Sequence, residues 1–333
     1  MSDRSLHVCA ALVVLAAPIY ATCKLAHAEH PGRMHEPSCT ATARWLRYAC
    51  PFDARDDLYS AIAKCQDASP VDGDCIAEAK SDYREARAEC GEVFHARLEV
   101  CAALDNEVHD PMFGSELAAS FVDPTEIGSS VAPNPYFPLV PGNRWVYEGP
   151  GETVTVVVTD KTKLIDGIRC VVVNDVVVDE DGFVVEDTDD WFAQDVDGNL
   201  WYCGEIAENY EVFAGDDPEV PELVDIEGSW KHDRDYAQAG MLLPFAPEVG
   251  AVIRQEVMYT DAEDVVEILS TTASEAAPGG ACVATCLQTL DFTALEPGVE
   301  EHKFYAPGIG LIVEINIEDG ERLELVEFVG VGS

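Results

Sequence analysis

The chain has 333 residues, with 63 Asp or Glu against 20 Lys or Arg, and its formal net charge is −43. Residues 105–333 hold nine basic and 48 acidic side chains, so −39 of that charge lies there. So strong a negative potential excludes nucleic acid and anionic lipid as partners and attracts cations, including calcium.

The N-terminus has the pattern of a secretory signal peptide. Arg4 precedes a mostly apolar run over residues 6–20, and Ala26-His27-Ala28 is a small-residue cleavage site. We therefore expect cleavage after Ala28 and a secreted or periplasmic protein. A lipoprotein acylated at Cys23 is the alternative, although the residues before this cysteine fit it poorly. The apolar run is too short for a membrane span, and no later segment predicts one.

Residues 29–37 are predicted to be the flexible N-terminus of the mature chain. They contain His30, Met34 and His35, which are copper-binding residue types. A disordered terminus is the favoured interpretation, because the segment is short and contains Pro and Gly.

Six cysteines in residues 38–104 have a mirrored spacing, with gaps of 11, 15, 10, 15 and 11 residues. On a helix, gaps of 11 and 15 return to nearly the same face, and a turn signal around Pro70 marks the midpoint. The spacing predicts an antiparallel α-hairpin in preference to a redox or metal store. Pro51 and Gly91 predict a shared bend at its middle. The expected disulfides are nested: Cys39–Cys101, Cys50–Cys90 and Cys65–Cys75.

Turn-forming residues dominate residues 105–133, which are predicted to be a linker. From residue 134 to 333, β-branched runs separated by Asp-Gly and Pro-Gly turns predict an acidic antiparallel β domain. The fold class is therefore α+β, with a curved antiparallel sheet or open β-barrel of about ten strands after the hairpin. The predicted strands are 144–148, 152–160, 168–178, 182–195, 199–205, 251–260, 264–273, 286–291, 300–305, 311–317 and 322–329, with a further extended stretch over 229–236.

The β domain contains four cysteines, Cys170, Cys203, Cys282 and Cys286. Their even number and the predicted export favour two disulfides, with the pairing left open. Joining Cys282 to Cys286 requires a local turn, because an extended strand would hold their α-carbons too far apart. A copper or redox site at these two residues is the less favoured alternative.

Four parts of the β domain resemble a group of secreted bacterial proteins with no assigned activity. The likeness covers most of residues 134–330 and implies an exported, mostly β domain. It supplies no catalytic residues. The segments that carry it are Asn134–Leu139 with Pro141–Gly149, Glu186–Asp195 with Gly198–Glu205, Arg254–Glu256 with Ala262–Asp264, and Tyr305–Leu311.

Seven polar residues of the predicted strands are candidate ligand-binding residues. Two of them, Arg254 and Lys303, are among only nine basic residues in the acidic region and could hold an anionic group on a concave face. If the side chains point outward, they form a salt-bridged surface instead. The seven are Asp190, Arg254, Glu256, Glu263, Asp264, His302 and Lys303.

Asp187, Asp189, Asp195 and Asp197 are candidate calcium ligands, because alternating carboxylates suit a hard cation. The segment 195–199 lacks the downstream glutamate of an EF-hand and lies in a predicted hairpin, so a turn is the favoured interpretation.

The motifs of serine hydrolases, zinc proteases, P-loop proteins and dinucleotide-binding proteins are absent from the sequence. We therefore expect an exported non-enzymatic binding, surface-interaction or structural protein without a firm cofactor. Its partner would be a cation, a small molecule or another surface protein. The alternative is a secreted hydrolase or a calcium- or copper-binding protein that uses carboxylates on the concave face.

Overall fold

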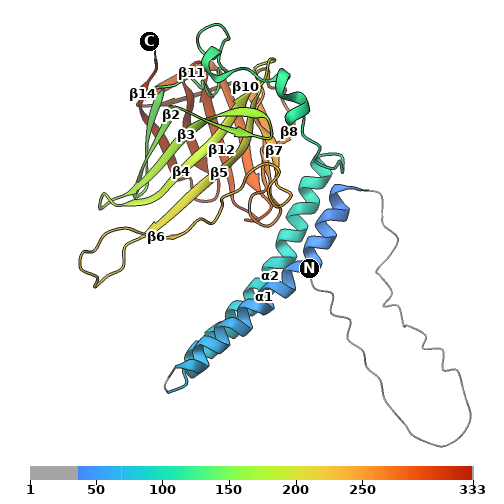
Figure 1. The fold of residues 1–333 in the computed structure, drawn as a ribbon, viewed down its shortest axis with the longest axis vertical. Helices are drawn as coiled ribbons and strands as arrows, with labels where there is room; N and C mark the ends of the chain where they lie inside the picture. The colour runs from blue at the N-terminus through green and yellow to red at the C-terminus, as the bar shows by residue number, and fades with distance from the viewer. Residues whose placement is uncertain (1–36, 69, 332–333) are drawn as a thin grey trace, which may run out of the picture. The chain divides into compact units, whose positions relative to one another are not determined.

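The computed structural model describes residues 37–68 and 70–331, and the chain from residue 37 onward forms one compact unit. Two helices precede a large antiparallel sheet (Figure 1), so the predicted α+β class is confirmed. The predicted signal peptide, its cleavage site and the His-Met cluster lie outside the described residues. Within the described part, no helix combines the length and apolar character that a membrane crossing requires.

The hairpin consists of α1 (Cys39–Asp67) and α2 (Gly73–Ala103). Side chains cap both N-termini: the Ser38 hydroxyl and the Asp72 carboxylate each accept hydrogen bonds from backbone N–H groups of the first turn. Pro51 lies inside α1, and the helix nevertheless continues to Asp67.

Three disulfides join the two helices, and they are the nested pairs that the mirrored spacing predicts. Their α-carbons lie 5.4, 5.9 and 5.8 Å apart. The helix seam itself is thin, because the buried side chains of α1 are all small. They are Cys39, Ala43, Ala54 and Cys65. Covalent links therefore replace much of the apolar packing that normally holds a helical hairpin together.

The sheet contains fourteen strands. They are β1 (Arg144–Gly149), β2 (Glu152–Ile165), β3 (Ile168–Asp179), β4 (Val184–Gln194), β5 (Leu200–Glu211), β6 (Glu222–Asp225), β7 (Gln238–Leu243), β8 (Val252–Arg254), β9 (Glu256–Val257), β10 (Asp264–Ala277), β11 (Gly280–Thr293), β12 (Glu300–Ala306), β13 (Gly310–Asn316) and β14 (Arg322–Val329).

The strand order makes the sheet nearly closed. It runs β8-β10-β11-β12-β13-β14-β1-β2-β3-β4-β5-β7-β9, with β6 paired to β5. The first and last strands of this path, β8 and β9, are separated in the chain only by Gln255. One short segment thus pairs with both ends of the sheet and curls it into a barrel-like form (Figure 1).

The prediction of about ten strands was wrong. β6 is a four-residue strand in an acidic loop, and all of its residues are exposed. It is too short to show the alternation of apolar and polar residues that marks a half-buried strand. β7 was not predicted as a strand. It contains Gly240, which has no side chain to show the alternation of a strand and is required by a close backbone contact: an added Cβ would lie 2.4 Å from the carbonyl oxygen of Arg254. The predicted strand 251–260 is split into β8 and β9, and residues 229–236 form no strand.

The linker covers the outer face of β3–β5 at one place. Phe113 and Phe121 pack edge-on against each other and beside Trp201, with ring centroids 5.3–6.3 Å apart. A ring nitrogen of His109 forms a 2.8 Å hydrogen bond with the carbonyl oxygen of Ala239. Further hydrogen bonds join the linker to the sheet: the Val122 N–H donates to the Gln194 carbonyl oxygen, and the Gln194 side-chain amide donates to the Ala132 carbonyl oxygen, each at 2.9 Å. The linker is therefore bound to the sheet by aromatic rings and several hydrogen bonds.

The remaining disulfides join Cys170 to Cys203 and Cys282 to Cys286. The second is possible because β11 bulges: Cys282 and Cys286 pair with residues only two apart on β10. The bulge brings the two α-carbons to 5.4 Å, and Ala284 has a φ of 55° there. This is the local turn that such a pairing requires.

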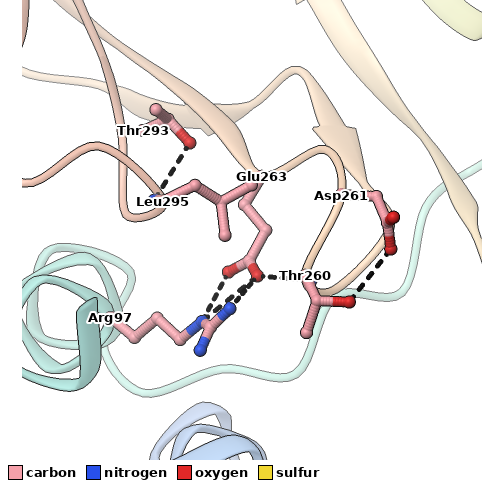
Figure 2. Close-up of polar contacts among 6 residues, drawn as sticks. All are labelled: Arg97, Thr260, Asp261, Glu263, Thr293 and Leu295. Carbon is pink, nitrogen blue, oxygen red and sulfur yellow. Dashed lines mark hydrogen bonds and ion pairs between the residues drawn. The ribbon is translucent and has the colours of Figure 1, made fainter. Parts of the chain in front are cut away.

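The base of the hairpin contacts the sheet through a buried ion pair. The Arg97 guanidinium on α2 donates to both carboxylate oxygens of Glu263, with Nε 2.9 and 3.1 Å from them (Figure 2). The backbone N–H of Thr260 also donates to Glu263, at 2.9 Å. Val100 packs nearby against Val265.

Candidate functional site

A cavity of about 560 Å³ lies where the two ends of the sheet path meet. Its lining comes from β4 and β5 at one end, β10 to β12 at the other, and the short segment that joins β8 to β9. Nine carboxylates and one amine line it, an imbalance that favours positively charged occupants. The ten are Glu186, Glu205, Glu227, Glu256, Asp261, Asp264, Asp291, Glu296, Glu301 and Lys303.

Glu205 belongs to a buried triad with Asp190 and Tyr202. The Tyr202 hydroxyl lies 2.5 Å from Oδ1 of Asp190 and 2.6 Å from Oε2 of Glu205. A hydroxyl has one proton and can donate to only one of them. The other contact requires a proton on a carboxyl group. Tyr202 therefore implies a carboxyl pair that shares a proton.

The electrostatics assign that proton to Glu205. Burial and the Asp190 carboxylate raise the pKa of Glu205 to about 9. Burial also raises the pKa of Asp190, but hydrogen bonds with Tyr202 and Glu205 hold it to about 6. Near neutral pH the Glu205 O–H donates to the Tyr202 oxygen, and the Tyr202 O–H donates to the Asp190 carboxylate.

Glu256 is the most unusual residue of the lining. Its side chain is buried, with 7% of the residue exposed, and Oε2 has no hydrogen-bond partner among the described residues. Burial raises the pKa of Glu256 well above its usual range, and the Asp264 and Glu205 carboxylates add to that shift. The buried indole N–H of Trp230, which also has no partner at normal hydrogen-bond distance, acts on the Glu256 carboxyl and lowers its pKa slightly against the effect of burial. Oε2 of Glu256 is therefore a buried acceptor that is incompletely satisfied, which normally costs stability.

The single amine of the lining is held by three carboxylates. Nζ of Lys303 lies 3.1 Å from Glu314, 3.4 Å from Glu301 and 3.8 Å from Asp291. Burial alone would lower the pKa of Lys303, but these carboxylates raise it well above its usual value. Lys303 is thus a fixed internal cation that is already neutralised, so the remaining carboxyl groups determine what the cavity attracts.

The structure brings together some of the predicted ligand-binding residues. Glu256, Asp264 and Lys303 line the cavity, and Asp190 lies behind Glu205 in the triad. His302 belongs to the opposite face of β12, because its neighbours Glu301 and Lys303 line the cavity and strand side chains alternate.

Arg254 and Glu263 belong to a different place. Both line a small crevice beside the hairpin, where Glu263 pairs with Arg97 and a guanidinium nitrogen of Arg254 lies 3.1 Å from Sγ of Cys39. The predicted set of seven residues is therefore divided between the cavity, the outside of β12 and the base of the hairpin.

The predicted calcium ligands fall into two separate groups. Asp187 and Asp189 both accept hydrogen bonds from the Asn174 amide. Asp195 accepts four hydrogen bonds within the β4–β5 turn, from Asn199, Trp201 and the backbone of Asp197. Among the described residues, no group of three or more His, Cys, Asp or Glu side chains has a geometry that could hold a metal ion.

Two cavity residues, Glu205 and Asp291, were missed. Their signal was the period of two along strands: Glu205 and Ala207 on β5 both line the cavity. A bulge between Trp191 and Phe192 shifts the β4–β5 register at this point, and the sequence does not reveal it.

No family model, curated protein or solved structure matches this chain. The chemistry of the site is therefore inferred from its own residues. The described lining contains no histidine, serine or cysteine, and its one hydroxyl side chain is Thr293. One tyrosine hydroxyl joins Asp190 and Glu205.

Proposed function

We propose that this protein is an exported, non-enzymatic binding protein whose acidic cavity takes a small organic cation bearing amino groups. The observation that carries the proposal is Glu256, a buried carboxyl group whose Oε2 has no partner at normal hydrogen-bond distance, at a cavity rich in carboxylates. An ammonium group supplies both the hydrogen-bond donor and the positive charge that such a site lacks.

The cavity fits a ligand of this size and polarity. A volume of about 560 Å³ lies within the range of small-molecule sites, which is roughly 300–1,000 Å³. Phe292, Leu295 and Val299 also line it and supply apolar contact for a carbon chain. Carboxylates combined with these side chains favour an aliphatic amine over a bare metal ion, which prefers a compact cage of oxygens.

Export is part of the same proposal. Five disulfides in the described chain support an oxidising compartment. The N-terminal pattern supports a cleaved signal peptide, and the resemblance to secreted bacterial proteins of unassigned activity supports the same compartment.

Calorimetric titration of the disulfide-bonded protein with spermidine tests the proposal. We expect saturable binding, weakened about tenfold or more in Glu256→Gln, because the amide can still accept a hydrogen bond but cannot supply the negative charge that makes this bond charge-assisted. Glu248→Gln is the matched control: Glu248 is exposed and lies outside the cavity lining, so its loss of one charge should change affinity less than about twofold.

Calcium chloride and an uncharged polyol serve as comparison ligands. Absence of spermidine binding, equal binding by both Gln variants, or tighter binding of calcium than of spermidine would each contradict the proposal.

A further inference from the structure

An exposed row of aromatic side chains lies along the outside of α1. Trp45, Tyr48, Phe52 and Tyr59 are 60, 63, 66 and 63% exposed in the described chain. At about 100° per residue, all four point within an arc of about 60°, roughly opposite the buried face of Ala43 and the cysteines. We call these four residues the aromatic stripe. So continuous an exposed apolar surface is typical of an interaction site.

The edges of the aromatic stripe carry opposite charges. Arg44 and Arg55 lie along one edge, and Asp56 lies along the other. Arg55 lies about 50° to one side of the centre of the arc and Asp56 about 50° to the other, only one residue apart along the axis. Asp56 forms no ion pair within residues 37–68 and 70–331.

This charge pattern is complementary to itself in one orientation. When two identical helices pair in parallel about a twofold axis, the left edge of one faces the right edge of the other at the same height. Arg55 then meets Asp56 of the second copy, and this contact occurs twice. In an antiparallel pair, each edge of the stripe would face the same edge of the second copy. That arrangement would place arginine against arginine.

The area is sufficient for a specific interface. An aromatic side chain buries about 150–250 Å², so four rings that are 60–66% exposed offer on the order of 500 Å² per copy. Two copies would bury about 1,000 Å² from the rings alone, near the lower limit for a specific complex. Tyr, Trp and Arg are also the residues that most often dominate binding energy at interfaces.

We propose that the aromatic stripe of α1 is a homodimer interface, in which two copies pair α1 against α1 in parallel. Phe52 lies near the twofold axis, and two symmetric Arg55–Asp56 contacts set the orientation. This interface is independent of the proposed cation site, because no residue of the stripe lines the cavity.

Analytical ultracentrifugation of the disulfide-bonded chain tests the interface, in about 0.15 M salt to screen repulsion between the acidic β domains. We expect a concentration-dependent dimer, weakened about a hundredfold in Phe52→Ala. Tyr236→Ala is the control: Tyr236 is 98% exposed in the β domain, and its loss should leave the dimer unchanged.

Charge exchange tests the orientation. Arg55→Asp should weaken the dimer about tenfold, and the double exchange Arg55→Asp with Asp56→Arg should restore it. A strengthened dimer in Arg55→Asp would overturn the parallel arrangement, since only antiparallel pairing relieves repulsion by that change. A monomer at every concentration, or a dimer insensitive to Phe52→Ala, would overturn the interface itself. Circular dichroism of each variant checks that α1 still folds.

Discussion

At the scale of single residues, the Asp190–Tyr202–Glu205 triad makes stability depend on pH. Glu205 has a pKa of about 9 in the folded chain and an ordinary value of 4.5, and the pKa of Asp190 rises from 3.8 to about 6. Between the ordinary and the raised pKa of each group, the unfolded chain binds fewer protons than the folded chain. The free energy of unfolding therefore falls as pH rises. The stabilising contribution is complete below about pH 4 and is lost progressively towards pH 9.

Substitution of Glu205 by Gln should flatten that dependence, because the amide needs no proton to stay neutral. We expect the midpoint of thermal unfolding to fall less steeply between about pH 5 and pH 9 in Glu205→Gln than in the parent chain. Differential scanning calorimetry checks this, with Glu248→Gln as a surface control. Parallel curves for all three proteins would show that Glu205 is ionised in the folded state.

Arg97 provides a second test at this scale. Arg97→Ala leaves the Glu263 carboxylate buried without its cation, which should cost about 3–5 kcal/mol and free the base of the hairpin from the sheet. Hydrogen exchange should then rise around Thr260 and in the last turns of α2. The matched double variant Arg97→Met with Glu263→Leu should recover most of the loss, since it removes both charges. Unchanged exchange in the single variant would mean that the ion pair does not hold the hairpin.

At the scale of elements, the hairpin was more predictable than the sheet. Mirrored cysteine spacing is a covalent and helical constraint that one sequence expresses fully, from Cys39 to Cys101. The closure of the sheet depends on contacts between distant segments. Nothing local distinguishes β8 and β9 from a single strand, although Gln255 between them is where the chain passes from one end of the sheet to the other.

The candidate site could be predicted from the sequence only in part. The mixed polar set of the predicted strands contained Glu256, Asp264 and Lys303, and all three line the cavity. The same set contained Glu263. Its side chain instead meets Arg97, a residue more than 160 positions away, and no local pattern announces such a contact.

Removal of the middle disulfide, Cys50–Cys90, should destabilise the hairpin but not the β domain. The seam of α1 contains only small buried side chains, so Cys50→Ser with Cys90→Ser should lower hairpin stability by about 2–4 kcal/mol. Far-UV circular dichroism should show helix loss at a temperature where strand signal persists. The control is Cys282→Ser with Cys286→Ser. It removes a disulfide that lies in the β domain and joins residues only four positions apart. Simultaneous loss of both signals in the hairpin variant would indicate one cooperative unit.

At the scale of the whole molecule, the negative charge bears on the proposed binding of a cation. The charge of −39 on residues 105–333 attracts cations over a distance, and this attraction weakens as added salt screens it. Inside the cavity the same charges are partly suppressed by bound protons, which keep crowded carboxyl groups stable without a ligand. An entering ammonium group would displace those protons, so the empty and occupied states differ by an exchange of cations.

The most direct measurement of this account is the number of protons released when spermidine binds, obtained by calorimetry in two buffers of different ionisation enthalpy. Between about pH 6.5 and pH 8.5 we expect release of about one proton per site and an affinity that rises about tenfold per pH unit. Glu256→Gln should weaken binding and Glu248→Gln should not. Binding without proton release, at an affinity independent of pH, would contradict the account.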